Sequence, residues 1–112
     1  MSLETLTKIE ELKGRFASDS KLADSEDTTG GVETPIGDVA SYSLFLDVEG
    51  AIDLRVYLSP DGGETWYEPR EESPISFGAA NTDVYWFEYD ADRIRLEGSN
   101  GTSVTAQIRE VV

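Results

Sequence analysis

From residue 38 onward, hydrophobic and polar residues alternate, which is the pattern of a β-strand with one buried face. In the first such segment, the hydrophobic residues from Tyr42 to Val48 occupy every second position. Turn residues (Gly, Pro, Asn and Asp) separate further short segments of this kind. The predicted strands are 41–48, 53–59, 65–67, 75–77, 84–89, 93–97 and 103–111. About seven short strands predict an all-β fold over residues 38–112, an antiparallel β-sandwich of jelly-roll or immunoglobulin-like type.

The N-terminal residues 1–16 have a different, helical period. The hydrophobic residues are three or four positions apart, so they share one face of an amphipathic helix over residues 2–16. They are Leu3, Leu6, Ile9, Leu12 and Phe16. An isolated helix of this length is marginal in water, so we expect its hydrophobic face to pack on something. The sequence leaves open whether that is its own domain or a neighbouring subunit.

Residues 17–37 are rich in Ser, Asp, Thr and Gly and show almost no hydrophobic period. This composition is typical of a linker, so we interpret the segment as an extended arm. An unstructured stretch of about twenty residues is uncommon inside a compact domain. The sequence therefore predicts three parts: a helix over 1–16, an arm over 17–37 and a β-sandwich over 38–112.

Charge narrows the choice of partners. The net charge is −14, from 23 acidic and 9 basic residues spread along the chain. Such a chain is repelled by nucleic-acid phosphates and by anionic lipids, so we expect it to bind neither nucleic acid nor membranes. The excess of acids over the few Lys and Arg resembles the composition of proteins from extremely halophilic archaea and their viruses.

The missing residue types exclude several kinds of chemistry. The chain has no Cys and no His, so it has no disulfides and no thiolate or imidazole metal ligands. No signal peptide or hydrophobic run of about 20 residues is present, so we expect synthesis in the host cytoplasm without membrane insertion. No nucleophile motif or phosphate-binding Gly loop is found, and we predict a protein that is not an enzyme and needs no cofactor.

One segment matches a known motif. Residues 59–66 fit the Asp-box pattern Ser-x-Asp-x-Gly-x-Thr-Trp through Ser59, Asp61, Gly63, Thr65 and Trp66. Gly62 and Gly63 permit positive φ in a tight turn, and Asp61 can accept hydrogen bonds from turn amides. Trp66 is expected to pack beneath the turn. Resemblance to the sialidase family implies a structural role for this turn, and binding of sugar or calcium by Asp61 is the alternative.

A broader resemblance extends over the predicted sandwich. Residues 40–69, 85–100 and 101–112 are similar, in strand order and in the position of the Asp-box turn, to small β-sandwich proteins of tailed viruses. Those proteins are virion components. Together with the acidic composition, this resemblance implies a structural protein of a haloarchaeal tailed virus, located in the virion. It implies a capsid decoration or turret component that forms a trimer or pentamer and contacts the major capsid protein or other virion proteins. The N-terminal helix, through its five hydrophobic residues, and the arm are expected to form the interface with neighbouring subunits.

Several other features leave alternatives open. Trp86 lies opposite Tyr85 and Phe87 in its predicted strand, so it is a candidate exposed aromatic residue unless both faces are buried. A carbohydrate-binding or host-adhesion module, with sugars stacked on Trp66, Tyr67 or Trp86, is one alternative function. A head–tail or tail component is another. Two acidic segments, 81–83 and 90–92, are weak candidates for a hard cation, and we expect no metal site.

The acidic composition makes a testable prediction about salt. Repulsion among the carboxylates destabilises the folded state in dilute buffer, and molar salt shortens the Debye length to about 3 Å. We expect the melting temperature to rise steeply between dilute buffer and molar KCl. Thermal unfolding followed by circular dichroism at several KCl concentrations measures this, and a constant melting temperature would contradict the halophilic interpretation.

Overall fold

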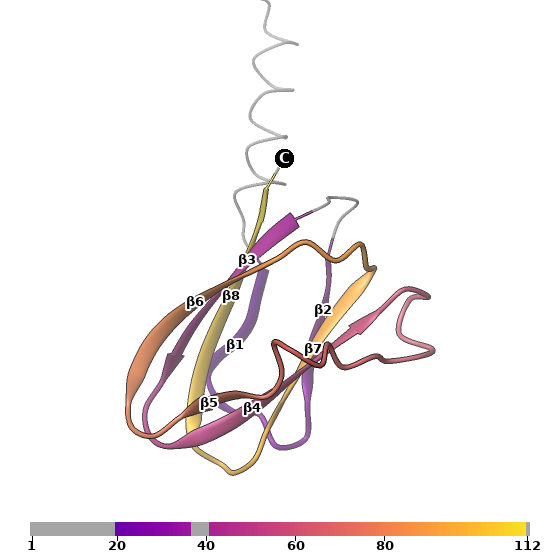
Figure 1. The fold of residues 1–112 in the computed structure, drawn as a ribbon. Helices are drawn as coiled ribbons and strands as arrows, with labels where there is room; N and C mark the ends of the chain where they lie inside the picture. Colours follow the sequence, from indigo (N-terminus) through magenta and orange to yellow (C-terminus); the bar gives the residue numbers. More distant parts are fainter. Residues whose placement is uncertain (1–19, 37–40, 112) are drawn as a thin grey trace, which may run out of the picture.

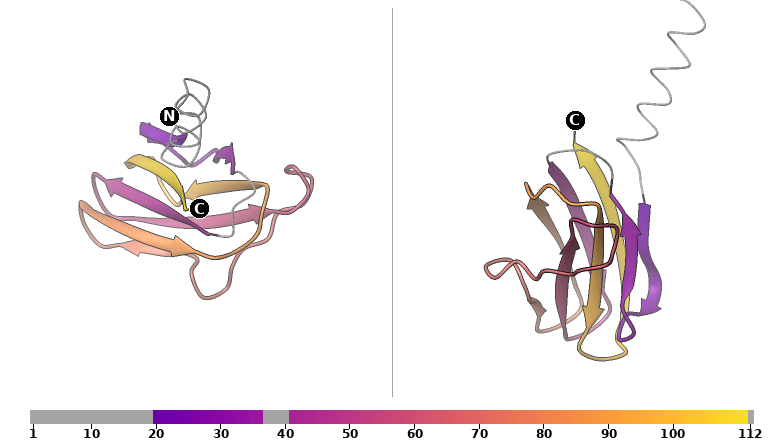
Figure 2. Two further views of the ribbon diagram at one scale, coloured as in Figure 1. Left: turned by 90° about the horizontal axis from the view of Figure 1, so that it is seen from above. Right: turned by 90° about the vertical axis from the view of Figure 1, so that its right-hand side faces the viewer.

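The computed structural model describes residues 20–36 and 41–111, in which eight β-strands form two antiparallel sheets. Figure 1 shows the strands, which form two facing layers in the views of Figure 2. Sheet A has the strand order β1-β8-β3-β6 and sheet B has the order β2-β7-β4-β5. The strands are β1 Ser20–Asp27, β2 Val32–Pro35, β3 Ser41–Val48, β4 Ile52–Ser59, β5 Ile75–Phe77, β6 Asn81–Phe87, β7 Arg93–Gly98 and β8 Ser103–Val111.

The strand pairing follows a simple rule. Strand β1 pairs with β8, β2 with β7, β3 with β6 and β4 with β5. The chain therefore forms one long antiparallel hairpin, and further pairing of β3 with β8 and of β4 with β7 wraps it into two sheets. This is the jelly-roll arrangement. The predicted antiparallel β-sandwich is confirmed, with eight strands in the described residues instead of about seven.

The core lies between the sheets and follows the predicted alternation. The inward residues of β3 and β4 are almost completely buried, whereas Asp47, Asp53 and Arg55 between them are exposed. The fully buried positions include Tyr42, Leu44, Leu54, Val56, Ile94, Leu96, Val104 and Ala106. Alternating residues point to opposite faces of a strand, so burying one face of each sheet specifies the register of these pairs.

The prediction of an extended arm over residues 17–37 is wrong for its described part. Residues 20–27 and 32–35 are strands of the two sheets, and they lie side by side at one edge of the sandwich. Leu22, Ala23 and Ile36 belong to the buried core. The domain therefore begins at β1 and not at residue 38. Residues 1–19, with the predicted helix and its five hydrophobic positions, lie outside the described residues.

The reason for this error is visible in the pairing of β1. Its register with β8 shifts between Lys21 and Ala23 and again between Ala23 and Glu26. Ser25 has a φ of 48°, in the left-handed region. Such irregularities put adjacent residues, here Leu22 and Ala23, on the buried side and remove the period of two. The hydrophobic pattern of this strand is therefore unreadable in the sequence.

The connection after β4 also differs from the prediction. No strand forms at 65–67, where a single bridge joins Tyr67 to Leu58 through two backbone hydrogen bonds of 2.8 Å. Residues 60–74 form a long connection on the edge of the sandwich where β5 and β6 lie (Figure 1).

The inclusion of β1 in the sandwich is testable with Leu22→Ala. Leu22 is 5% exposed, and removal of a buried leucine side chain costs about 2–5 kcal/mol of unfolding free energy. We expect a loss in that range in urea unfolding of the full chain. Lys21→Ala, at an exposed position of the same strand, is the matched control and should change stability little. Superimposable curves for Leu22→Ala and wild type would show that β1 is not part of the folded core.

Candidate interaction sites

The turn after β4 is built around two side chains. The Ser59 hydroxyl, which is fully buried, donates a hydrogen bond to Asp61 Oδ1 at 2.8 Å and accepts one from the Gly63 amide at 2.8 Å. Asp61 Oδ1 also accepts the Thr65 amide at 2.8 Å. Gly62 and Gly63 have φ angles of 73° and 99°, a region that residues with a Cβ rarely adopt. These are the bonds and angles expected of the turn from its sequence.

Electrostatics at the turn follow from the same contacts. Hydrogen bonds from the side chain and amide of Thr65, and then from the Ser59 hydroxyl, lower the pKa of Asp61 below its ordinary value. Each of these bonds favours the charged carboxylate. Asp61 therefore holds the turn as an ionised acceptor.

A second set of contacts joins the turn to the connection between β6 and β7. The Asp92 amide donates to the Ser59 carbonyl at 2.7 Å, and Asp92 Oδ2 accepts the Gly62 amide at 3.2 Å. Trp66 is half-buried, and its Cζ2 atom lies 3.5 Å from the position that a Cβ at Gly63 would occupy. The indole therefore packs against the turn, as the sequence predicted.

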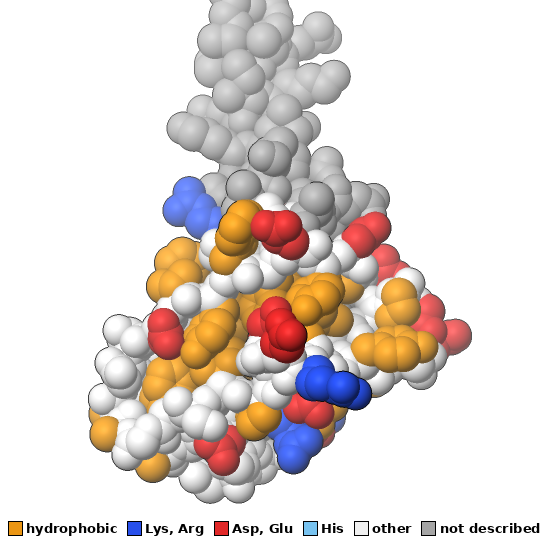
Figure 3. All heavy atoms as spheres, in the orientation of Figure 1, with side chains coloured by type: hydrophobic (Ala, Val, Ile, Leu, Met, Phe, Trp, Pro, Cys, Tyr) orange, Lys and Arg blue, Asp and Glu red, His pale blue; other side chains and the backbone are white. Residues whose placement is uncertain are grey.

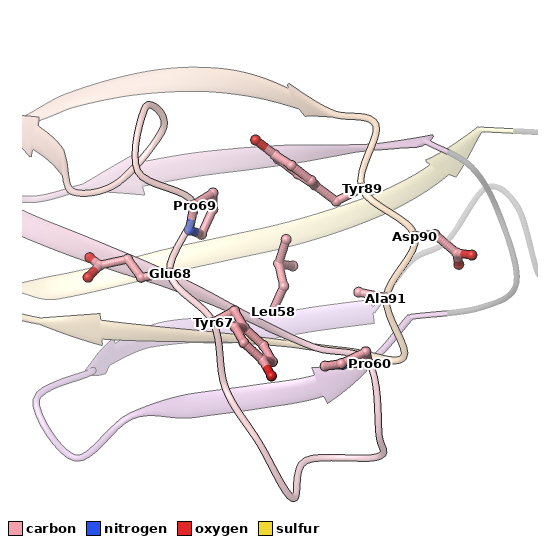
Figure 4. A pocket seen from close by; sticks show the side chains of 8 residues that line it. All are labelled: Leu58, Pro60, Tyr67, Glu68, Pro69, Tyr89, Asp90 and Ala91. Atoms are coloured by element: carbon pink, nitrogen blue, oxygen red, sulfur yellow. The ribbon is translucent and has the colours of Figure 1, made fainter.

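These contacts leave a small hollow between the two connections, which we call the tyrosine pocket. It has a volume of about 210 Å³. Its lining residues are Leu58, Pro60, Tyr67, Glu68, Pro69, Tyr89, Asp90 and Ala91. Figure 4 shows Leu58 between the two tyrosines, while the carboxylates of Glu68 and Asp90 point away from the middle. The hollow itself is therefore lined mainly by hydrophobic groups.

Both tyrosines of the pocket are held in place. The backbone of Tyr67 is bridged to Leu58, and the Tyr89 hydroxyl donates to Glu72 Oε2 at 3.0 Å. This hydrogen bond is the main cause of the raised pKa of Tyr89. The Tyr89 ring also continues a row of rings from the core, 6.4 Å from that of Phe87, which stacks on Tyr42 at 5.4 Å. The pocket is therefore preformed.

The two carboxylates beside the pocket differ in their contacts. Glu68 accepts the Ser73 hydroxyl at 2.6 Å and pairs with Arg55 at 3.3 Å. Asp90 is exposed and makes no hydrogen bond or ion pair with another residue of the described part. One end of the pocket therefore carries a negative charge that no described residue neutralises.

A second candidate site is on the outer side of sheet A. Phe45, Val84 and Trp86 are 40%, 55% and 63% exposed, and we call them the outer hydrophobic face. Phe45 is opposite Val84 in the pairing of β3 with β6, and Trp86 lies on the same side of β6 as Val84. Of the two arrangements left open by the sequence, the structure buries Phe87 and exposes Trp86.

Strand β6 is also an edge of sheet A. Next to the outer hydrophobic face, the side-chain oxygens of Asn81 and Asp83 accept the amides of Thr82 and Val84 at 2.9 and 2.8 Å. These local bonds occupy amides that would otherwise attract another strand. Contact through the side chains of this face is therefore favoured over strand addition at this end of β6.

Hydrophobic side chains are also concentrated where the two sheets separate. Figure 3 shows this on the edge with β5 and β6, in the seam between β6 and the connection that follows β4. At the opposite edge, β1 and β2 lie side by side. The hydrophobic surface that Figure 3 shows is therefore on the same edge of the molecule as the tyrosine pocket.

Three of the candidate cation ligands have other roles in the fold. Asn81, Asp83 and Asp92 each accept a backbone amide, as described above. Within residues 20–36 and 41–111, no cluster of three or more acidic side chains is placed to hold a metal ion. The same residues include no helix long and hydrophobic enough to cross a membrane.

The role of Ser59 in the turn is testable by substitution. Ser59→Ala removes a buried acceptor and leaves the Gly63 amide without it, which costs about 1–3 kcal/mol of unfolding free energy. We expect this loss in urea unfolding. Ser76→Ala, at an exposed position of β5, is the control. Equal stability of the two variants would contradict the assignment of the turn as a stabilising element.

Comparisons with known proteins identify no family. No protein-family model matches the sequence, and no curated protein is similar to it. Among solved structures, one described as the structure of infectious bursal disease virus Gx strain is 14% identical, with a TM-score of 0.35. The alignment covers 81% of this chain and 32% of that chain. A likeness this distant gives no indication of function.

Proposed function

We propose that the protein is a structural component of a virion, a capsid decoration or turret protein of a haloarchaeal tailed virus, with no catalytic activity. In this role it binds neighbouring copies of itself, as a trimer or pentamer, and the major capsid protein or other virion proteins. Its N-terminal segment, residues 1–16, contributes to these contacts. It binds neither nucleic acid nor membranes.

The outer hydrophobic face is the observation on which this proposal depends. A protein with a net charge of −14 exposes Phe45, Val84 and Trp86 together on one side of a sheet. Exposed aromatic residues are enriched at protein–protein interfaces, and their exposure to water is unfavourable unless a partner covers them. A binding function explains this arrangement more directly than a catalytic one.

The virion itself is inferred from weaker arguments. The sequence resembles small β-sandwich proteins of tailed viruses, and its acidic composition resembles that of halophilic proteins. The strand order is that of a jelly roll, a fold found in viral capsid domains and also in lectins and cupins. Because one fold supports many functions, this last argument is an analogy.

A carbohydrate-binding or host-adhesion module is the second candidate function. Trp86 and Tyr67 are 63% and 60% exposed, which leaves both rings free to stack on a sugar. Trp66 is less available because it packs against the turn. A virion protein that binds a host glycan would combine both candidates, and a head–tail or tail position remains the alternative within the virion.

The experiment with the most direct outcome is immunogold labelling. An antibody against this chain should label intact particles of the virus that encodes it, and unlabelled particles would contradict a virion role.

The contact surface is tested separately by sedimentation velocity of the full chain in molar KCl. We expect Trp86→Ser to weaken self-association by about tenfold, which corresponds to about 1.4 kcal/mol. Ser76→Ala, on the other sheet, should leave self-association unchanged.

A further inference from the structure

We propose that the tyrosine pocket binds the end of the N-terminal segment of a second copy of this chain. Phe16 enters the pocket, and Arg15 lies near Asp90. This inference rests on the proposed function in one respect, because it takes the N-terminal segment to contact a neighbouring subunit. The inference adds to the proposed function the place where the N-terminal segment binds and the chemical groups that recognise it.

The lining of the pocket selects a hydrophobic side chain. Leu58 and Ala91 are buried, and Tyr67 and Tyr89 lie beside them as partly exposed rings. A volume of about 210 Å³ is below the ~300–1,000 Å³ of most small-molecule sites, so the pocket suits one side chain of a larger partner. An aromatic ring contacts both tyrosines by stacking or edge-to-face packing.

The surroundings of the pocket add a requirement for positive charge. Asp90 lies at one end with no neutralising partner in the described part of the chain. Glu71 and Glu72 are close enough to Tyr89 to raise its pKa through their charges, although the hydrogen bond to Glu72 is the larger cause. A hydrophobic residue accompanied by Lys or Arg therefore complements the pocket better than a hydrophobic residue alone.

The chain itself contains such a segment. Residues 1–16 carry three acidic and three basic side chains, so their charges balance, while residues 17–112 carry the whole net charge of −14. Two basic residues lie next to hydrophobic ones: Lys13 directly follows Leu12, and Arg15 directly precedes Phe16. Among the hydrophobic positions of the predicted helix, Phe16 is the aromatic one. The N-terminal segment is thus the part of the chain that the acidic body repels least.

The proposed function favours a second copy as the source of Phe16. Phe16 and Ser20 are four positions apart, and a fully extended chain of that length spans about 14 Å. Strand β1 begins at Ser20 on one edge of sheet A, whereas Tyr89 and Ala91 of the pocket follow β6, the strand at the other edge. Three strand spacings of ~4.8 Å already equal about 14 Å in a straight line through the sheet. The reach of these residues is therefore no greater than the width of sheet A, and the mixing experiment below distinguishes insertion into a second copy from insertion into the same chain.

A sugar fits the pocket less well than this segment. Recognition of a sugar in a pocket needs polar groups that accept or donate hydrogen bonds to its hydroxyls. In Figure 4 the carboxylates of Glu68 and Asp90 point away from the middle of the hollow, and Glu68 is already bonded to Ser73 and Arg55. The interior therefore offers rings and aliphatic groups rather than fixed hydrogen-bonding partners.

The first test is complementation between two full-length variants, followed by sedimentation velocity in molar KCl. Phe16→Ser removes the inserted side chain, and Tyr67→Ala removes one wall of the pocket. We expect each variant alone to lose about tenfold or more in self-association, and an equimolar mixture to recover part of it. Recovery follows because the intact Phe16 of one chain meets the intact pocket of the other. A mixture no better than the separate variants overturns the proposal.

The second test locates the contact. A synthetic peptide of residues 2–19 is titrated into isotope-labelled full-length Phe16→Ser, and amide shifts are followed by NMR. We expect shifts at Tyr67, Tyr89 and Ala91, and affinity lowered about tenfold by Tyr67→Ala but unchanged by Phe45→Ser. A peptide with Arg15→Glu should bind more weakly in dilute buffer, with a smaller difference in molar KCl. No dependence on Arg15 at low salt would contradict the pairing with Asp90.

The outcomes separate this inference from the proposed function. Peptide shifts confined to Phe45, Val84 and Trp86 overturn the inference but leave the proposed assembly role intact. Pocket shifts produced by a simple methyl glycoside, with none from the peptide, overturn it in favour of a sugar site. A monomeric full chain together with unlabelled virions overturns the proposed function as well. Unfolding curves of Phe16→Ser and Tyr67→Ala serve as controls, and that of Tyr67→Ala should match the wild type because Tyr67 is 60% exposed.

Discussion

Each of the first four strands pairs with one of the last four, so the two halves of the chain run together through the whole domain. This pairing brings the inward faces of both sheets together and allows alternate residues from Tyr42 to Val48 to be buried against those of β4 and β7. Burial of those faces is the main stabilising term, at about 25 cal/mol per Å² of hydrophobic surface. The same pairing explains why β1 and β2 are needed: without them, β8 and β7 would be edge strands with unpaired backbone groups.

The wrapped hairpin also creates the tyrosine pocket. Leu58 lies near the end of β4, and Tyr89 and Ala91 lie in the connection between β6 and β7, about thirty residues later in the sequence. The turn from Ser59 to Thr65 closes the space between them, because Asp92 bonds to both Ser59 and Gly62. A structural turn motif therefore has a second consequence, since it fixes one wall of a hollow next to it.

Charge makes the few exposed hydrophobic groups conspicuous. The chain carries 23 acidic residues against 9 basic ones, and ion pairs such as those of Glu33 with Arg93 and Arg95 occupy several of the basic residues. Two places are different: the outer hydrophobic face on β3 and β6, and the tyrosine pocket. Both are on or near the edge formed by β5 and β6, opposite the edge where β1 starts. The positions of these two surfaces are consistent with a subunit that contacts its neighbours on one side. On the same side it would bind their N-terminal segments.

The sequence alone indicated the strands from β3 to β8, because most of them keep one face buried and so preserve the period of two. Strand β6 is the exception: it begins at Asn81 instead of 84, and Phe87 is its one buried residue. It also determined the turn at Ser59–Thr65, whose glycines and hydrogen-bonding side chains act locally, and the acidic surface. Only the tertiary structure placed β1 and β2 in the sheets, since the register shifts near Ala23 erase the alternation. It alone decided that Trp86 faces outward while Phe87 is buried, and it alone assembled the pocket. Both depend on which residues distant in sequence become neighbours, and that is set by strand pairing rather than by any local pattern.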